Sequence, residues 1–214
     1  MKLLGDYIHN KGLKYGIYAS PSEFTCNYEH YLGSLGHEQQ DATMWASWGI
    51  DYLKYDGCNG GTPERWKLMR TALDNTKRDI VYSTNSSKDS TVGAQLWRTT
   101  SDIRNGWTSM SDIGFSQNGN EKYVGTGRYN DPDMLVVGSP EFAKTKIPLT
   151  HIEQITHLTL WSMLAAPLLM SCDLSKTDDL LYSILCNDDV LDINQDPQFN
   201  EGQSGGWYGS CQSL

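Results

Sequence analysis

The sequence predicts an α/β fold built from parallel β/α units, and three observations support this prediction. Segments rich in β-branched and aromatic residues alternate along the chain with segments of helical period. Successive strand-like segments recur at intervals of about 17–40 residues, which leaves room for a crossover helix between parallel strands. Polar side chains cluster where strand-like segments end, at Ser20, Asp56, Asn85, Asp102, Asp133 and Asp173.

Two architectures are compatible with this alternation, a doubly wound sheet and a (β/α)₈ barrel. No glycine-rich phosphate-binding loop opens any of the predicted helices, which argues against a nucleotide-binding sheet. In barrel enzymes the active site lies at the carboxyl ends of the strands, where this sequence places its polar residues. The barrel is therefore the favoured architecture.

Helices are predicted from their end signals and their apolar period. Gly12 and Gly49 end the first two helices, Thr62 and Pro63 form a typical helix start, and Thr150 with Glu153 forms a capping box. The predicted helices are residues 1–11, 37–48, 63–74 and 151–165, and a short helix that starts at Ser175.

Strands are predicted where short apolar runs are bounded by glycine, proline or other turn residues. The predicted strands are residues 13–19, 50–55, 79–83, 95–100, 133–137 and 167–171, with a further strand near 190–194. Six strands from residue 13 to residue 171 leave an eight-stranded barrel two strands short.

Composition excludes several classes of partner. The net charge of −9 argues against nucleic acid or an anionic membrane, because both would repel the chain. No apolar run reaches membrane-spanning length, and the N-terminus lacks the apolar segment of a signal peptide. The five cysteines form no CxxC pair, and no HExxH spacing occurs, so no metal site is predicted.

Two carboxylates near predicted strand ends lie close to cations. Lys54 and Asp56 point to the same face of one predicted strand because side chains alternate, and Asp102 follows Arg98 by four residues. A glycosidase requires two such carboxyl groups, one ionised nucleophile and one proton donor, roughly 5–5.5 Å apart in a retaining enzyme. The alternative is a solvated strand with an incidental ion pair.

Several further motifs occur in one order along nearly the whole chain, to about residue 200. Together they closely resemble the retaining α-galactosidases (melibiases), a family that includes α-N-acetylgalactosaminidases. The motifs are GLKYGIY (12–18), the Cys26 loop, GSLGHE (33–38), DA (41–42), WGIDYLKYDGC (48–58), WRTTSDI (97–103), NDPDML (130–135), AAPL (165–168) and NQDP (194–197).

The resemblance implies an activity, a mechanism and no cofactor. It implies hydrolysis of terminal α-D-galactosyl residues from a small galactoside or oligosaccharide, through a covalent intermediate on the nucleophile. The nucleophile falls on Asp56 and the acid/base on Asp102. Lys54 and Arg98 match residues that hold sugar hydroxyls, and Met134 matches a residue that lines the pocket. Cys26 and Cys58 match a disulfide pair beside the site.

One departure from the family pattern concerns specificity. Many α-galactosidases have Cys-Glu-Trp at the end of the fifth barrel strand, where this chain aligns Asn85, Ser86 and Ser87. A small Ser86 leaves room for a larger sugar 2-substituent, as in the N-acetylgalactosaminidases. The residues that follow match neither subgroup, so α-N-acetylgalactosaminidase and β-L-arabinopyranosidase activities stay open as alternatives.

A second departure concerns the extent of the match. The family barrel has two strands before the helix at residues 1–11, and they carry a Trp and an Asp-Asp pair that bind the sugar. A C-terminal antiparallel β-domain also has no counterpart. The sequence is therefore interpreted as a fragment, with a partial (β/α)₈ catalytic barrel over residues 1–200 and an unassigned tail over residues 201–214.

This interpretation has consequences for activity and location. The isolated chain is expected to be poorly active, and a non-catalytic remnant is the rival hypothesis. A bridged Cys26–Cys58 pair implies an oxidising compartment, so the full-length parent is expected to be secreted or otherwise extracytoplasmic. The oligomeric state is not predicted.

Overall fold

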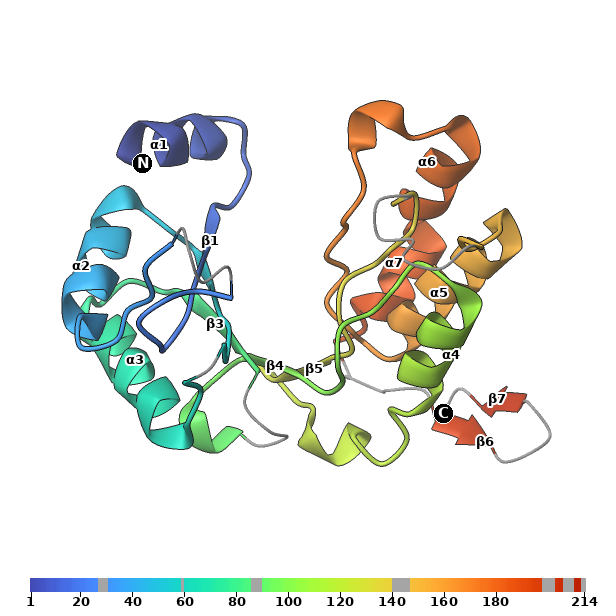
Figure 1. Cartoon of the computed structure of the whole chain (residues 1–214). Coiled ribbons are helices and arrows are strands. Elements are labelled where there is room, and N and C mark those ends of the chain that lie inside the picture. The colour runs from blue at the N-terminus through green and yellow to red at the C-terminus, as the bar shows by residue number, and fades with distance from the viewer. Residues whose placement is uncertain are drawn as a thin grey trace. The chain divides into compact units, whose positions relative to one another are not determined.

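The structure is a computed structural model that describes residues 1–26, 31–58, 60–85, 90–139, 147–197, 203–205 and 210–212. The chain divides into two compact units, Met1–Arg98 and Thr99–Leu214, and each is described by itself (Figure 1).

The first unit consists of β/α units in regular alternation. Its elements are α1 (Lys2–Asn10), β1 (Gly16–Ala19), α2 (Glu38–Trp48), β2 (Tyr52–Tyr55), α3 (Pro63–Asn75), β3 (Val81–Thr84), the 3₁₀ helix η1 (Ser90–Val92) and β4 (Leu96–Arg98). The strands are parallel and lie in the order β1-β2-β3-β4. The predicted parallel β/α arrangement is therefore confirmed for this unit.

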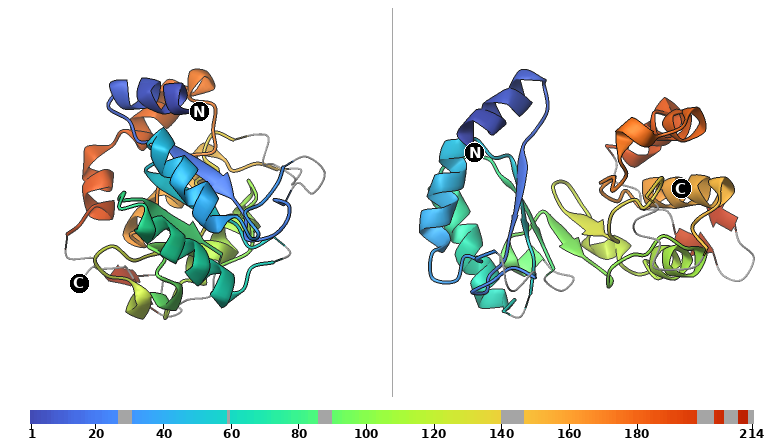
Figure 2. Two further views of the ribbon diagram at one scale, coloured as in Figure 1. Left: turned by 90° about the vertical axis from the view of Figure 1, so that its left-hand side faces the viewer. Right: turned by 45° about the horizontal axis from the view of Figure 1, so that its top comes forward.

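Helices cover one face of this sheet. Figures 1 and 2 show α2 and α3 side by side on the same side of β1, β2 and β3. Leu53 and Tyr55 of β2 are fully buried in the hydrophobic core beneath these helices. Side chains alternate along a strand, so Lys54 projects from the opposite face, where it is only half-buried.

The structure has the predicted helix start at α3 and the predicted helix end at α2. The Thr62 side chain accepts a hydrogen bond from the Arg65 N–H, with Pro63 at the first helical position of α3. Gly49 ends α2 in the left-handed conformation, with a φ of 80°.

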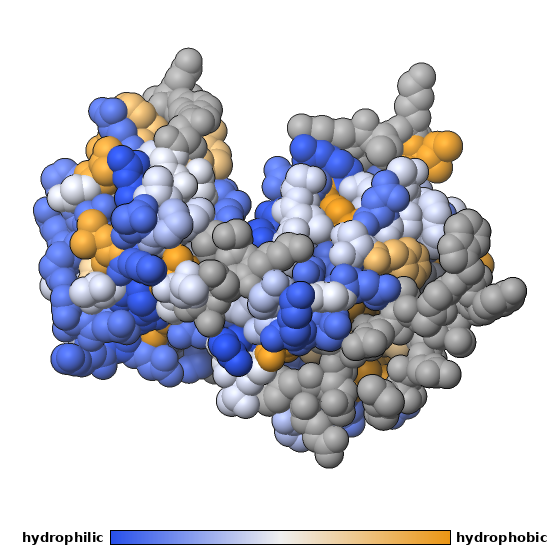
Figure 3. Space-filling model, turned by 90° about the horizontal axis from the view of Figure 1, so that it is seen from below, coloured by the Kyte–Doolittle hydropathy of each residue, from blue (hydrophilic) through white to orange (hydrophobic). Residues whose placement is uncertain are grey.

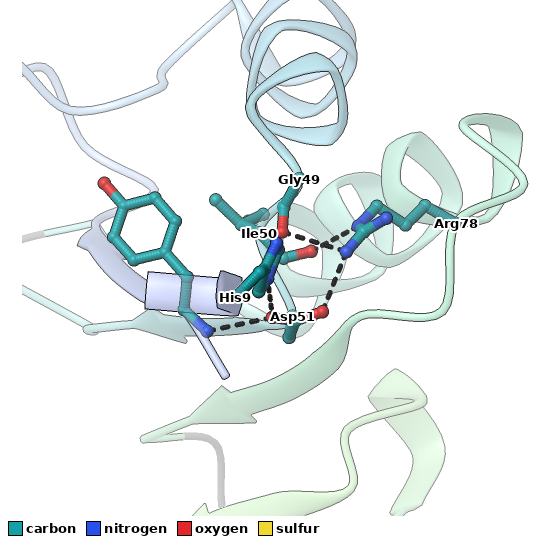
Figure 4. Close-up of polar contacts among 6 residues, drawn as sticks. His9, Gly49, Ile50, Asp51 and Arg78 are labelled. Carbon is teal, nitrogen blue, oxygen red and sulfur yellow. Dashed lines mark hydrogen bonds and ion pairs between the residues drawn. The ribbon is translucent and has the colours of Figure 1, made fainter. Parts of the chain in front are cut away.

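A polar clamp holds the amino-terminal end of β2 (Figure 4). Asp51 Oδ2 accepts hydrogen bonds from Tyr15 N–H at 2.8 Å and from His9 Nε2–H at 2.7 Å. Asp51 Oδ1 accepts from Arg78 Nη2 at 2.8 Å, and Arg78 also donates to the carbonyl oxygens of Ile50 and Gly49. Burial raises the pKa of Asp51, but these hydrogen bonds and the charges of His9 and Arg78 outweigh it and leave the pKa below its usual value.

The second unit is mostly helical. Its elements are α4 (Trp107–Phe115), the 3₁₀ helix η2 (Glu121–Tyr123), β5 (Tyr129–Asp131), α5 (His151–Met163), the 3₁₀ helix η4 (Leu174–Lys176), α6 (Asp179–Leu185), α7 (Asp188–Asn194), β6 (Gln203–Gly205) and β7 (Ser210–Gln212). Helix α5 contacts α4, α6 and α7 and has the predicted capping box between Thr150 and Glu153. Strands β6 and β7 pair antiparallel with each other.

His157 is fully buried within this unit. Its Nε2 accepts a hydrogen bond from Val136 N–H at 3.2 Å, and its ring meets the Trp161 ring edge-to-face at a centroid distance of 4.1 Å. Burial lowers the pKa of His157 to about 3, so the imidazole is neutral and can accept this bond.

Four predicted elements of this unit are corrected by the structure. The strand predicted at 133–137 is not regular, because Leu135 forms only an isolated parallel bridge to Met170, and the regular strand is β5. Asp133 and Gly138 both have positive φ, 86° and 67°, which interrupts the extended backbone on either side of Leu135. The bridge partner lies in the predicted strand at 167–171, which is likewise not a regular strand.

The other two corrections concern the end of the chain's helical part. Residues 190–194 belong to α7, and not to a strand, because Asn187 caps the helix by accepting from Val190 N–H. Ser175, where a short helix was predicted to start, lies in the 3₁₀ helix η4. The α-helix α6 starts only after Asp178, whose side chain caps it by accepting from Leu181 N–H. Helix α4 was not predicted.

The described surface is largely hydrophilic on the face that Figure 3 draws. Figure 3 shows a face on which hydrophilic residues predominate in the described part and hydrophobic ones are scattered. No helix in the described part of the chain is both long and apolar enough to cross a membrane.

Candidate active site

Asp56 directly follows the carboxyl end of β2, and the sheet register explains its surroundings. Tyr18 of β1, Lys54 of β2 and Ser83 of β3 are aligned neighbours across the parallel strands. Because these residues share one level, the Tyr18 hydroxyl reaches Asp56 and donates to its Oδ2 at 2.8 Å. Lys54 Nζ donates to Ser83 Oγ at 3.5 Å. Tyr18 is therefore a neighbour of both Lys54 and Asp56, the two residues expected on one face of the sheet.

The environment of Asp56 leaves part of the carboxylate available. The side chain is half-buried, and Oδ1 accepts no hydrogen bond from any residue in the described part of the chain. The backbone N–H of Asp56 donates to Ala19 O at 2.9 Å, which continues the strand pairing up to the carboxylate. A carboxylate that accepts hydrogen bonds from the described residues on one oxygen only is suited to nucleophilic attack through the other.

The predicted disulfide between Cys26 and Cys58 is confirmed. It joins the loop after β1 to the loop after β2, with a Cα–Cα distance of 5.1 Å. The Tyr18 hydroxyl oxygen lies 3.4 Å from Cys58 Sγ, and Cys26 Sγ lies 3.4 Å from Asp56 Oδ2. Sulfur and carboxylate atoms so grouped are typical of metal ligands, but the disulfide removes the thiolates that a metal would require.

Further contacts join these two loops. The Ser22 hydroxyl lies 2.7 Å from the Cys58 carbonyl oxygen, and Arg65 Nη1 donates to the carbonyl oxygens of Pro21 and Gly60. Gly33 passes so close to Ser22 that an added Cβ would lie 2.1 Å from the Ser22 carbonyl oxygen, so no other residue fits there. The loops that surround Asp56 are thus held by covalent and polar contacts.

An open cavity of about 720 Å³ lies beside this group. It is lined by Tyr18, Thr25, Cys26, Tyr31 and Leu32. Aromatic side chains with exposed faces are suited to stacking on sugar rings, and the side chains of Tyr18 and Tyr31 are both exposed.

Asp102 belongs to the second unit, on the loop that precedes α4. Its side chain is exposed, whereas the next residue, Ile103, is 2% exposed and packs in the hydrophobic core of this unit. Met134 is half-buried against the same core, and its N–H donates to Asp133 Oδ1 at 2.8 Å. Asp133 was noted in the sequence only as a polar residue near a strand end.

The remaining predicted residues are placed as follows. Arg98 is the last residue of β4 and is half-buried. Ser86 lies outside the described residues. Asp56 and Lys54 belong to the first unit, and Asp102 and Met134 belong to the second. Tyr18 was missed in the sequence, because only the register between β1 and β2 places its hydroxyl next to Asp56.

The similarity to known proteins covers almost the entire chain. The family model described as alpha galactosidase A matches residues 1–196. Alpha-galactosidase 2 from Arabidopsis thaliana is 42% identical over 205 residues, which cover 92% of this chain and 50% of the relative. The chain therefore spans about half the length of the curated relatives that it matches.

Solved structures agree with the sequence match. Alpha-galactosidase I from Mortierella vinacea superposes with a TM-score of 0.83 at 31% identity, over 94% of this chain and 57% of that one. The alpha-galactosidase from Saccharomyces cerevisiae, solved with raffinose, has a TM-score of 0.81 at 27% identity, over 98% of this chain and 54% of that one. These relatives are (β/α)₈-barrel enzymes, and the parallel units of this chain are part of such a barrel. The chain belongs to the alpha galactosidase A family.

Proposed function

We propose that the protein hydrolyses terminal α-D-galactosyl residues from galactosides by a retaining double displacement. The observation that carries the proposal is Asp56 itself, a half-buried carboxylate at the end of a parallel strand, held on Oδ2 by Tyr18 in a chain of this family. The relative solved with raffinose supports a galactosyl oligosaccharide as the substrate class.

Each step of the proposed reaction uses one carboxyl group of the chain. Asp56 attacks the anomeric carbon, and the bond from that carbon to the leaving oxygen breaks while Asp102 gives its proton to that oxygen. A water molecule then attacks the anomeric carbon, Asp102 accepts a proton from the water, and the ester bond to Asp56 breaks. Asp102 is thereby protonated again, and galactose leaves with its original anomeric configuration.

Other residues are proposed to bind the sugar. Lys54 and Arg98 would hold its hydroxyl groups, Met134 would line the pocket, and Ser86 would face the 2-substituent. Residues 1–200 are proposed as the part of the catalytic barrel in this chain, and residues 201–214 as a tail. The reaction needs only two carboxyl groups and water, so no cofactor is invoked.

Two related activities remain as alternatives, α-N-acetylgalactosaminidase and β-L-arabinopyranosidase. A panel of the three glycosides tests both alternatives. A Ser86→Glu variant tests the first, since a larger acidic residue near the 2-substituent is expected to reduce activity on the N-acetylated sugar more than on galactose. An unchanged preference would show that Ser86 does not face this substituent.

The disulfide supports an oxidising compartment for maturation. Cys26 and Cys58 are bridged, and such bonds persist in secreted and lumenal proteins and are rare in the cytosol. We therefore propose an extracytoplasmic location.

The function is tested with 4-nitrophenyl α-D-galactoside and the protein expressed from its complete gene. Wild type is expected to cleave the α-anomer and not the β-anomer, and NMR of the first product is expected to show α-galactose. A galactose-configured covalent inactivator is expected to label the peptide that contains Asp56.

The matched variants are Asp56→Asn, which removes the nucleophile, and Asp6→Asn, which makes the same substitution at a residue of α1 with no proposed role in the reaction. Asp56→Asn is expected to lose activity by at least about 10⁴-fold, because the covalent step is lost. Labelling elsewhere, or an Asp56→Asn variant as active as wild type, would disprove the assignment.

A further inference from the structure

The loop that carries Asp102 is fixed by the residues that follow it. Ile103 N–H donates to Asp133 Oδ2 at 2.9 Å, and Arg104 N–H donates to Ser109 Oγ at 2.9 Å. Asn105 Nδ2 donates to Ser139 O, and Asn105 Oδ1 accepts from Leu149 N–H, both at 2.8 Å. These contacts and the buried Ile103 side chain hold the backbone next to Asp102, from which its carboxyl group projects.

The contact to Ile103, the residue after Asp102, comes from Asp133, which is distant in sequence. The Asp133 side chain is buried, and its two oxygens accept from two separate segments, Oδ2 from Ile103 N–H and Oδ1 from Met134 N–H. One carboxylate therefore links the loop of Asp102 to the segment of Met134.

Asp133 is itself held in a strained backbone conformation. Its φ is 86°, in the left-handed region that residues other than glycine, asparagine and aspartate rarely adopt. The conformation is maintained by two hydrogen bonds, from Asp133 N–H to Asp131 Oδ1 at 2.9 Å and from Trp161 Nε1–H to Asp133 O at 2.7 Å. Strain that is held by surrounding contacts is characteristic of functional sites.

We propose that Asp133 is a positioning residue that sets the Asp102 carboxyl group for proton transfer by fixing the backbone at Ile103. This inference rests on the proposed function, in which Asp102 is the acid/base. Asp133 acts through the main chain, and no contact between Asp133 and the sugar is required.

The variant Asp133→Asn isolates this role. Asparagine tolerates positive φ and is almost isosteric, so the turn is retained. Its side chain has a single acceptor oxygen, so it can satisfy Ile103 N–H or Met134 N–H but not both, and its amide N–H₂ group faces the other donor. The loop is expected to shift, while the core around Ile103 stays in place.

The kinetic test uses kcat/KM for a series of α-galactosides whose leaving groups differ in acidity. A sugar leaving group, as in raffinose, needs the proton from Asp102, whereas 2,4-dinitrophenolate leaves without it. Asp133→Asn is expected to lower kcat/KM on the order of 100-fold for raffinose and by less than about 5-fold for the dinitrophenyl substrate. A loss of purely structural origin would lower both equally.

Two controls accompany the kinetics. Asn120→Ala removes a buried hydrogen bond to Gln117 in the same unit and is expected to lower the melting temperature with equal effects on both substrates. Amide hydrogen exchange at Ile103 is expected to accelerate in Asp133→Asn and to be unchanged in Asn120→Ala.

Three outcomes would overturn the inference. Equal losses on both substrates in an active protein, or unchanged exchange at Ile103, would reject the positioning role and leave the proposed function intact. A wild-type protein that cleaves no glycoside in the series would reject the proposed function and the positioning role together.

Discussion

At the scale of single residues, the balance between burial and polar contacts determines the pKa of a side chain. His157 is fully buried and neutral, accepts a hydrogen bond from Val136 N–H, and has a pKa of about 3. Burial raises the pKa of Asp51, but its hydrogen bonds and its interactions with His9 and Arg78 outweigh this effect, so the pKa lies below its usual value.

His157 should make the folded protein sensitive to acid. Between the unfolded value of about 6.5 and the folded value of about 3, the unfolded chain binds a proton that the folded chain excludes. Stability is therefore expected to fall by about 1.4 kcal/mol for each pH unit through this window as the pH decreases. Urea unfolding of wild type and His157→Gln from pH 7 to pH 4 measures the difference between the two.

The glutamine variant keeps an acceptor for Val136 N–H and cannot titrate. Its stability is expected to depend less steeply on pH, so the wild-type disadvantage should grow as the pH decreases. Parallel curves for the two proteins would show that His157 does not contribute to the acid sensitivity.

At the scale of elements, one carboxylate connects several segments at the amino-terminal end of β2. Asp51 bonds to His9 of α1, to the N–H of Tyr15 just before β1, and to Arg78 after α3. The end of β2 opposite Asp56 is thus fixed to its neighbours, which supports the register that aligns Tyr18 with Lys54.

Asp51→Asn should therefore destabilise the first unit. The variant loses the charge that His9 and Arg78 contact, and charge-assisted bonds of this kind contribute about 1.5–3 kcal/mol each, so a loss of about 3 kcal/mol is expected at pH 7. Chemical denaturation followed by tryptophan fluorescence measures it.

The matched control for Asp51→Asn is Asp6→Asn, which breaks the exposed Lys2–Asp6 pair within α1. Exposed pairs of this kind contribute about 0–1 kcal/mol. The ionised Asp51 side chain contributes its full stabilisation of the fold above its pKa in the unfolded chain, about 3.9. This stabilisation is lost as the pH falls through the lower pKa of Asp51 in the folded protein. Equal effects of the two variants at neutral pH would contradict the clamp.

At the scale of the whole molecule, the chain spans about half the length of its curated relatives. The family resemblance places sugar-binding residues in barrel strands that this chain's match does not include. Effective catalysis requires the sugar to be held in position against Asp56, because small misplacements of the reacting groups are costly.

The 214-residue chain is therefore expected to be a poor catalyst by itself. A chimera in which residues 1–196 replace the matching region of the Mortierella vinacea enzyme supplies the other barrel segments. The chimera is expected to hydrolyse an aryl α-galactoside on the order of 100-fold faster than the chain alone.

Both proteins are compared at equal concentration, with Asp56→Asn in each background as the control for contaminating activity. Circular dichroism melting shows whether each is folded before rates are compared. Hydrolysis by the isolated chain at the rate of the chimera would contradict this expectation.

The sequence by itself determined the parallel β/α units of the first half, the principal helix caps and the family. Their signals are local, since Thr62-Pro63 and the Thr150–Glu153 capping box act within one helical turn. The motifs around Asp56 and Asp102 are likewise continuous in sequence, so the candidate catalytic residues could be predicted from them.

Tertiary structure alone decided the contacts between segments that are distant in sequence. Tyr18 reaches Asp56 through the register of two strands, and Asp133 reaches Ile103 across 30 residues. The positive φ of Asp133 also replaced a predicted strand with an isolated bridge. Local propensity does not encode such contacts, because they form only when separate segments pack together and their buried polar groups require partners.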